Sequence, residues 1–162
     1  MPKTRINFDL KKDLKIQAEF IRGILSLVKE YRKKYPEHER LLDVNKMRTA
    51  DCIIRVTTNF VCEARDDIYT SEGLRENPKA KRYQEHIIPV KQIVENIDEN
   101  PSLANIQKEL LSAEIAILTN EEAQTYRGKK SPHFGVFGET HRSPEQIEKF
   151  KKHFKLKNQK KS

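Results

Sequence analysis

The chain has 162 residues, enough for one compact domain or for a helical module joined to a second small module. Hydrophobic residues make up 36% and charged residues 35%, yet the apolar residues recur at regular spacing, which excludes a disordered chain. No apolar run approaches the roughly 18 residues of a membrane-spanning helix, and residues 1–5 are not followed by the apolar stretch of a secretion signal. We therefore expect a cytoplasmic protein without contact to a membrane.

The charge balance predicts a polyanionic partner. The chain carries 32 Lys and Arg against 24 Asp and Glu, a net charge of +8, which is typical of proteins that bind nucleic acid. Its two cysteines, Cys52 and Cys62, have no companions at the spacing of a metal site. We expect both to be buried, reduced thiols, and neither a disulfide framework nor a zinc site.

The first half of the chain reads as helix. Apolar residues at three- and four-residue spacing predict three successive helices, over 9–35, 37–48 and 51–69. Pro36 ends the first of them. Residues 52–61 are rich in β-branched side chains, so a pair of strands is the alternative there. Gly, Asn and Pro mark 71–78 as a loop, so residues 1–75 are expected to form a helical N-terminal module.

The second half mixes strands with shorter helices. The predicted strands are the β-like run 81–90, which Pro89 closes, and the continuous apolar run 115–118. The predicted helices cover 90–97 and then follow the caps Ser102, Thr119 and Ser143, with Glu122 completing a capping box and Pro144 and Gln146 a second start signal. We expect a module over 76–142, a basic C-terminal helix and tail over 143–162, and an α+β fold that is predominantly helical.

The run 81–90 also places an acidic residue beside a histidine, Glu85 and His86. A histidine can act as a general base near neutral pH, and a carboxylate is a hard ligand suited to Mg²⁺ or Mn²⁺. Hydrolysis of a phosphodiester needs a water activated by a base and a metal that stabilises charge on the phosphoryl oxygens. The alternative is that Glu85 is a solvated strand residue and His86 a structural histidine.

Glu85-His86-Ile87-Ile88-Pro89 resembles the Asp-His-Ile-x-Pro opening of the HNH, or His-Me finger, nucleases. This resemblance implies a small ββα-metal-like module over roughly residues 82–127, with 115–118 as its second strand and the helix from Asn120. It implies Glu85 as a metal ligand and His86 as the general base. The family's second ligand position falls near Ala123, which cannot bind a metal, so Glu122 or its neighbour Glu121 would have to replace it.

The resulting hypothesis is a metal-dependent endonuclease that hydrolyses DNA with Mg²⁺ or Mn²⁺, with His86 as base and Glu85 and Glu122 as ligands. Seven basic residues are expected to hold the nucleic acid: Arg82, Arg127, Lys129, Lys130, Arg142, Lys151 and Lys152. Because of Ala123, the alternative is a non-catalytic basic factor of phage or mobile-element type, which binds nucleic acid or inhibits a host protein. A helical protein whose partner binds residues 10–35 is a further possibility.

Overall fold

The computed structural model describes residues 7–65, 68–127, 141–153 and 155–156. They form an α+β fold that is predominantly helical, as expected. The contacts divide the chain into two compact units. Unit 1 combines the chain up to Arg65 with Ile93–Leu111, and unit 2 combines Asp66–Gln92 with the chain from Ser112 onward. The chain is thus grouped differently from the three consecutive modules expected from the sequence.

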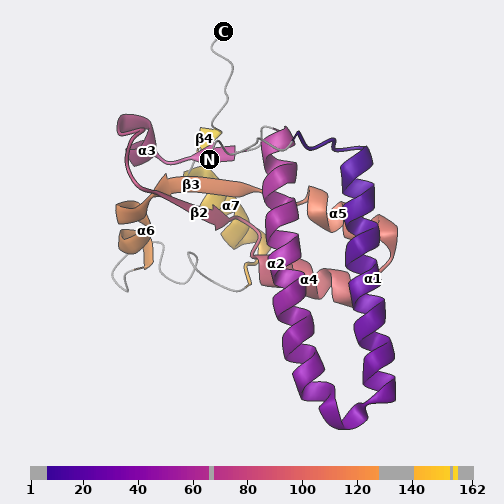
Figure 1. Ribbon diagram of the computed structural model, residues 1–162. Coiled ribbons are helices and arrows are strands. Elements are labelled where there is room, and N and C mark those ends of the chain that lie inside the picture. The colour runs from indigo at the N-terminus through magenta and orange to yellow at the C-terminus, as the bar shows by residue number, and fades with distance from the viewer. Residues whose placement is uncertain (1–6, 66–67, 128–140, 154, 157–162) are drawn as a thin grey trace. The chain divides into compact units, whose positions relative to one another are not determined.

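Unit 1 is built on a helical hairpin (Figure 1). Helix α1 spans Lys12–Lys34, a 3₁₀ turn covers Pro36–His38, and α2 spans Glu39–Arg65. The expectation of two helices over 37–69, and the alternative of strands within 52–61, are both wrong. The stretch lacks Gly and Pro, and its apolar residues keep helical spacing, so one helix continues through the expected break.

The core of unit 1 lies between this hairpin and two shorter helices, α4 at Val90–Glu99 and α5 at Leu103–Leu111. Its buried hydrophobic residues recur at three- and four-residue spacing on each helix and include Leu14, Ala18, Ile21, Leu25, Ala50, Ile54, Val61, Ile93, Val94, Ile97, Ile106 and Leu110. Neither Cys52 nor Cys62 is in a disulfide, but only Cys62 is buried, so the expectation of burial for Cys52 is wrong. Cys52 lies on the exposed side of α2.

Unit 2 contains a four-stranded sheet with the order β2-β3-β1-β4. The strands are β1 at Ile68–Thr70, β2 at Arg82–His86, β3 at Ile115–Thr119 and β4 at Lys155–Leu156. The central strand β3 pairs parallel with β1 and antiparallel with β2, and β4 pairs antiparallel with β1. The apolar run predicted to be a buried strand is therefore confirmed.

Three local expectations in unit 2 are wrong. Residues 68–70 form a strand rather than the end of a helix, and the predicted loop contains a short helix, α3 at Glu72–Glu76. Ser71 caps this helix, because its hydroxyl accepts a hydrogen bond from the Leu74 N–H at 3.2 Å. Residues 155–156 belong to the sheet rather than to a tail, since their backbone pairs with β1.

The predicted helix caps are confirmed. Helix α6 spans Asn120–Arg127 and α7 spans Pro144–His153. At the start of α7 the Ser143 hydroxyl accepts from the Gln146 N–H at 3.2 Å, and the Gln146 side chain accepts from the Ser143 N–H at 2.7 Å. Within the described part of the chain, no helix combines the length and the apolar character needed to cross a membrane.

Adjacent leucines at the end of α5 test the core of unit 1. Leu110 is fully buried, whereas Leu111 is 39% exposed. We expect Leu110→Ala to lower the free energy of unfolding by about 2–5 kcal/mol, because it leaves a cavity in a packed core. Leu111→Ala removes the same atoms and should cost less than about 1 kcal/mol. Urea denaturation followed by circular dichroism measures both, and equal losses would contradict this core.

Candidate nuclease site on strand β2

The chain contains the strand, strand and helix of the predicted module in the expected order. Strand β2 pairs with β3 in the register that sets Glu85 opposite Ala116 and His86 opposite Ile115. Helix α6 follows β3 directly. This order places Glu85 and His86 on strand β2 and Glu122 on helix α6, all within unit 2. Their individual contacts determine what chemistry they can perform.

The Glu85 carboxylate is held by two side chains of unit 2. Its Oε1 accepts a hydrogen bond from Arg142 Nη2 at 2.9 Å, and its Oε2 accepts from the Tyr83 hydroxyl at 3.2 Å. The side chain of Glu85 is only 13% exposed. The positive charge beside the Glu85 carboxylate is therefore that of Arg142. In a metal site, the metal ion would supply this charge.

The Arg142 side chain is fully buried, and its guanidinium donates several hydrogen bonds. Besides Glu85, it donates from Nη1 to the carbonyl oxygens of His86 at 2.6 Å and Ile87 at 2.9 Å. The guanidinium also lies over the Phe150 ring, 4.6 Å from its centroid. A buried cation is tolerated only when it is paired and hydrogen-bonded, so these contacts explain how Arg142 can lie inside the unit.

The backbone of Arg142 is fixed by a second side chain. Gln92 accepts from the Arg142 N–H at 2.9 Å through its Oε1 and donates to the Arg142 carbonyl at 3.2 Å through its Nε2. This paired contact resembles one rung of a β-ladder made by a side-chain amide. Residue 142 is thereby held from both its backbone and its side chain.

His86 lies at the end of β2 and is 5% exposed. The next residue, Ile87, is fully buried and donates its N–H to the Glu114 carbonyl at 2.9 Å. A general base must reach the water from which it takes a proton. The burial of His86 therefore favours the alternative role, a structural histidine, over the role of general base.

Glu122 is the acceptor at the centre of a different network. Its Oε2 accepts from the Ser71 hydroxyl at 2.5 Å and the Thr119 N–H at 2.8 Å, and its Oε1 accepts from the Gly73 N–H at 2.9 Å. Thr119 returns a bond, since its hydroxyl accepts from the Glu122 N–H at 3.1 Å. The capping box predicted here is confirmed, and it also ties α6 to the start of α3.

These contacts change the acidity of Glu122. Burial alone would raise its pKa, but the hydrogen bonds from Ser71, Thr119 and Gly73 outweigh burial and hold the pKa below the usual 4.5. Gly73 is matched to this carboxylate, because a Cβ added there would lie 2.7 Å from Glu122 Oε1. The charged form of Glu122 therefore helps to hold the fold of unit 2.

The two acids predicted to share a metal lie at different ends of β3. Glu85 is level with Ala116, whereas Glu122 bonds to Thr119, three residues and therefore roughly 10 Å farther along the strand. Among the described residues, no group of three or more His, Cys, Asp or Glu is placed to hold a metal ion. The donors in the described part of the chain do not fit the predicted Mg²⁺ or Mn²⁺ site.

The predicted nucleic-acid ligands are scattered. Arg82 and Lys152 are exposed, and Arg82 donates to the Pro78 carbonyl at 3.4 Å. Lys129 and Lys130 lie outside the described residues, as does the side chain of Arg127. With Arg142 buried, no continuous basic surface joins the described members of this group.

Lys151 forms an ion pair within unit 2. Its ammonium group lies 2.6 Å from Glu114 Oε2. Burial would lower the pKa of Lys151, but the hydrogen bond to Glu114 and the charge of that carboxylate outweigh burial and raise it. The lysine is therefore firmly charged and already paired.

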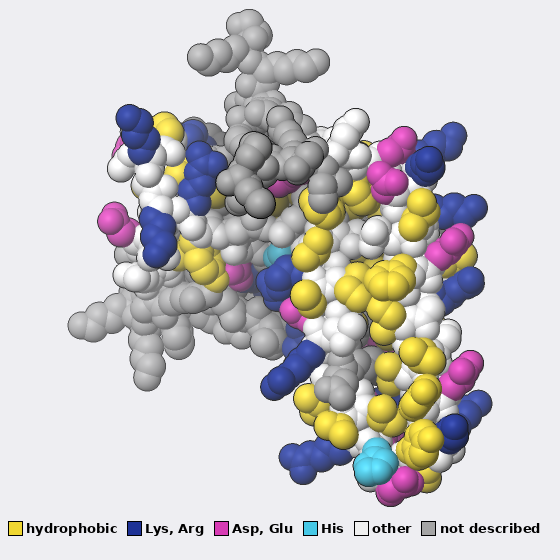
Figure 2. Space-filling view, viewed as in Figure 1, with side chains coloured by type: hydrophobic (Ala, Val, Ile, Leu, Met, Phe, Trp, Pro, Cys, Tyr) yellow, Lys and Arg dark blue, Asp and Glu magenta, His cyan; other side chains and the backbone are white. Residues whose placement is uncertain are grey.

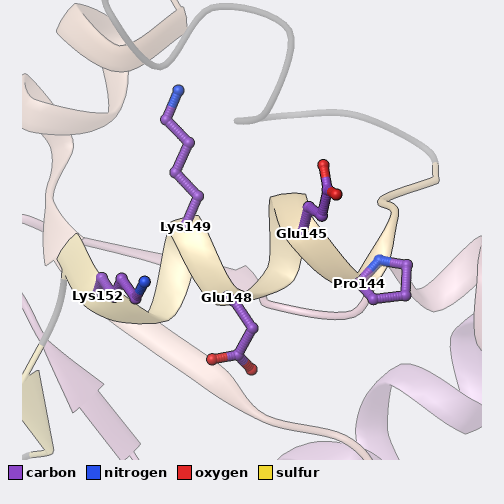
Figure 3. A pocket seen from close by; sticks show the side chains of 5 residues that line it. All are labelled: Pro144, Glu145, Glu148, Lys149 and Lys152. Carbon is purple, nitrogen blue, oxygen red and sulfur yellow. The ribbon is translucent and has the colours of Figure 1, made fainter.

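An open hollow on α7 contains the other exposed charges of this helix (Figure 3). It is lined by Pro144, Glu145, Glu148, Lys149 and Lys152. Two carboxylates and two ammonium groups line it, so its formal charges balance. A phosphate would find as many repelling groups as attracting ones.

A more regular basic surface lies on α1, where the sequence reasoning placed none. Five exposed cations recur along one side of the helix and the residue before it: Lys11, Lys15, Arg22, Lys29 and Lys33. At 3.6 residues per turn they fall within an arc of about 40°. Figure 2 shows Lys and Arg along the outer edge of α1, with some acidic side chains between them. Helical spacing of the basic residues is the signal that could have revealed this stripe.

Comparisons of the chain with family models, curated proteins and solved structures gave no significant match. Membership of the HNH family therefore stays a prediction from the motif, and the function has to be argued from the contacts themselves.

The Glu122 network predicts a pH-dependent contribution to stability. We expect Glu122→Gln to lower the free energy of unfolding at pH 7 by about 1–3 kcal/mol, because a neutral amide is a weaker acceptor and brings its own donors. The deficit should shrink as the pH falls through the lowered pKa of Glu122, where the wild-type carboxylate loses its charge. Urea denaturation at pH 7 and about pH 3 measures this difference.

The neighbouring acid supplies the control for this experiment. Glu121 lies exposed in the same first turn of α6. Glu121→Gln removes the same charge near the same helix terminus and should change the free energy of unfolding by about 0.5 kcal/mol or less. A deficit of Glu122→Gln that stays constant with pH would contradict the role assigned to its charge.

Proposed function

We propose that this protein is a non-catalytic, basic protein that binds double-stranded DNA. One observation carries the proposal: the Arg142 guanidinium lies against the carboxylate of Glu85, the residue to which the resemblance assigns the metal. The strand, strand and helix of the nuclease-like module are retained as a scaffold. A protein cation replaces the metal as the partner of the acid.

The energetics of this pair support a structural role. A fully buried guanidinium cannot lose its proton, so removing Glu85 from it would leave an uncompensated charge inside the unit. A divalent ion arriving at Glu85 would meet a cation already in contact with the carboxylate. Both effects disfavour the exchange of Arg142 for a metal.

The surface that supports DNA binding is the basic stripe on α1. From Lys11 to Lys33 it extends over roughly 33 Å at 1.5 Å per residue, close to the length of about one turn of duplex DNA. Cations at this spacing can follow the phosphates of one backbone, and the net charge of +8 favours the approach of a polyanion. Contacts of this kind give affinity without reading the sequence.

Salt-dependent binding of a labelled duplex tests the proposal. Each phosphate contact contributes about −0.9 to the slope of log K against log salt concentration. We expect Arg22→Gln with Lys29→Gln to make the slope shallower by about two units. The matched control is Lys149→Gln with Lys152→Gln, which removes two exposed charges of α7 beside two carboxylates and should leave the slope unchanged.

A plasmid assay with Mg²⁺, Mn²⁺ or EDTA tests the absence of catalysis in the same preparations. We expect no metal-dependent nicking by wild type or by His86→Ala. Nicking that requires a divalent metal and is lost in His86→Ala would establish the endonuclease instead. In the salt-dependence experiment, an equal change in the slope of log K for the α1 and α7 variants would reject the basic stripe as the binding surface.

A further inference from the structure

The half of the hairpin nearest its turn lacks a core of its own. None of the described residues from Ser26 to Thr49 is buried, although this segment holds many large apolar side chains. Those of known exposure are Leu27, Val28, Tyr31, Tyr35, Leu41, Leu42 and Val44. Figure 2 shows hydrophobic side chains gathered over both helices of the hairpin. Helices gain most of their stability by packing an apolar face, so this arm calls for a covering surface.

Helix α1 carries a second apolar stripe on the side away from its buried one. Ile16, Phe20, Leu27 and Tyr31 are 51%, 56%, 54% and 47% exposed. With 3.6 residues per turn they fall within an arc of about 60°. The buried residues of α1, Leu14 to Leu25, face almost the opposite direction. The exposed stripe follows the seam spacing by which helices pack against each other.

A glycine lies in the middle of this stripe. Gly23 is exposed, and no atom lies within 4 Å of the position that a Cβ would occupy. Glycine in the interior of a helix is unfavourable relative to alanine, and nothing in the described contacts of the chain requires it here. Its position suits the close approach of another helix at the centre of the stripe.

The stripe is complementary to itself when two copies of α1 run antiparallel. In the register centred between Gly23 and Ile24, Phe20 of one copy lies opposite Leu27 of the other, and Ile16 opposite Tyr31. Ile24, which is half-buried, then lies opposite Gly23, so a bulky side chain meets an open position. Each of these contacts occurs twice, as in any interface with twofold symmetry.

The charges at the ends of the stripe match in the same register. Asp13, in the first turn of α1, lies level with Lys34 of the second copy, and Lys34 lies level with its Asp13. Within one copy the Lys34 ammonium lies over the Tyr35 ring, 5.3 Å from its centroid, at the border of the stripe. Opposite charges therefore meet at both ends of the apolar contact.

We propose that the exposed stripe of α1 is a self-association surface, which binds a second copy of this chain through an antiparallel pairing of the two α1 helices. The turn-proximal arm of each hairpin then covers Ile16 and Phe20 of the other. The basic stripe lies on a different side of α1, so both copies keep it available.

Sedimentation equilibrium of the full chain tests this inference, after nuclease treatment so that nucleic acid cannot bridge two copies. We expect a species of twice the 19.1 kDa chain mass. Leu27→Glu should raise the dissociation constant by about a hundredfold or more, because both copies lose an apolar contact and bury a charge. The control Leu111→Glu, at another exposed leucine, should leave it unchanged.

Charge reversal tests the register independently of the Leu27→Glu variant. At about 0.1 M salt, Asp13→Lys and Lys34→Asp should each weaken the dimer several-fold, and the two changes together should restore it. A monomer at all concentrations up to about 0.1 mM would overturn the proposal. So would a dimer that Leu27→Glu leaves intact, or a double reversal weaker than both single changes.

Discussion

The buried guanidinium of Arg142 is the constraint on which unit 2 depends. A permanent positive charge in the interior is stable only with a full set of acceptors. Here they are the Glu85 carboxylate and the carbonyl oxygens of His86 and Ile87, at the end of β2. Gln92 holds the backbone of the same residue, and Phe150 packs against the guanidinium. One residue thus joins the end of β2, the start of α4 and helix α7.

The two acids that a metal site would have to bring together belong to separate networks. Glu85 is committed to Arg142, and Glu122 to Ser71, Gly73 and Thr119. Glu85 is stabilised by the positive charge of Arg142, and Glu122 by three hydrogen-bond donors. Neither carboxylate needs a metal ion to stabilise its charge. The strand, strand and helix can therefore keep the order seen in the nuclease motif while their two acids serve only to hold the fold.

Local signals in the sequence predicted much of the fold. Capping patterns at Thr119 and Ser143 located the starts of α6 and α7, because a cap depends only on residues three positions apart. The apolar run of β3 was recognisable for the same reason. The strand β1 was missed, since three residues after a long helix carry no periodicity of their own.

The candidate site could not be predicted in the same way. Arg142 and Glu85 are 57 positions apart, and no local pattern links them. The sequence presented Glu85 and Glu122 as potential ligands, but their partners come from distant segments. Apolar residues on α1 are likewise recognisable by their helical spacing. This spacing does not distinguish the buried stripe of Leu14 to Leu25 from the exposed stripe of Ile16 to Tyr31, because both have the same period.

The coupling free energy between Glu85 and Arg142 tests the central claim most directly. It is measured by urea denaturation of the wild type, Glu85→Gln, Arg142→Met and the double variant. If the pair is a buried structural contact, the coupling should be about 1.5 kcal/mol or more, with each single change costing more than its share of the double. Additive effects, with a coupling within about 0.3 kcal/mol of zero, would show that the two groups do not depend on each other and would contradict the account.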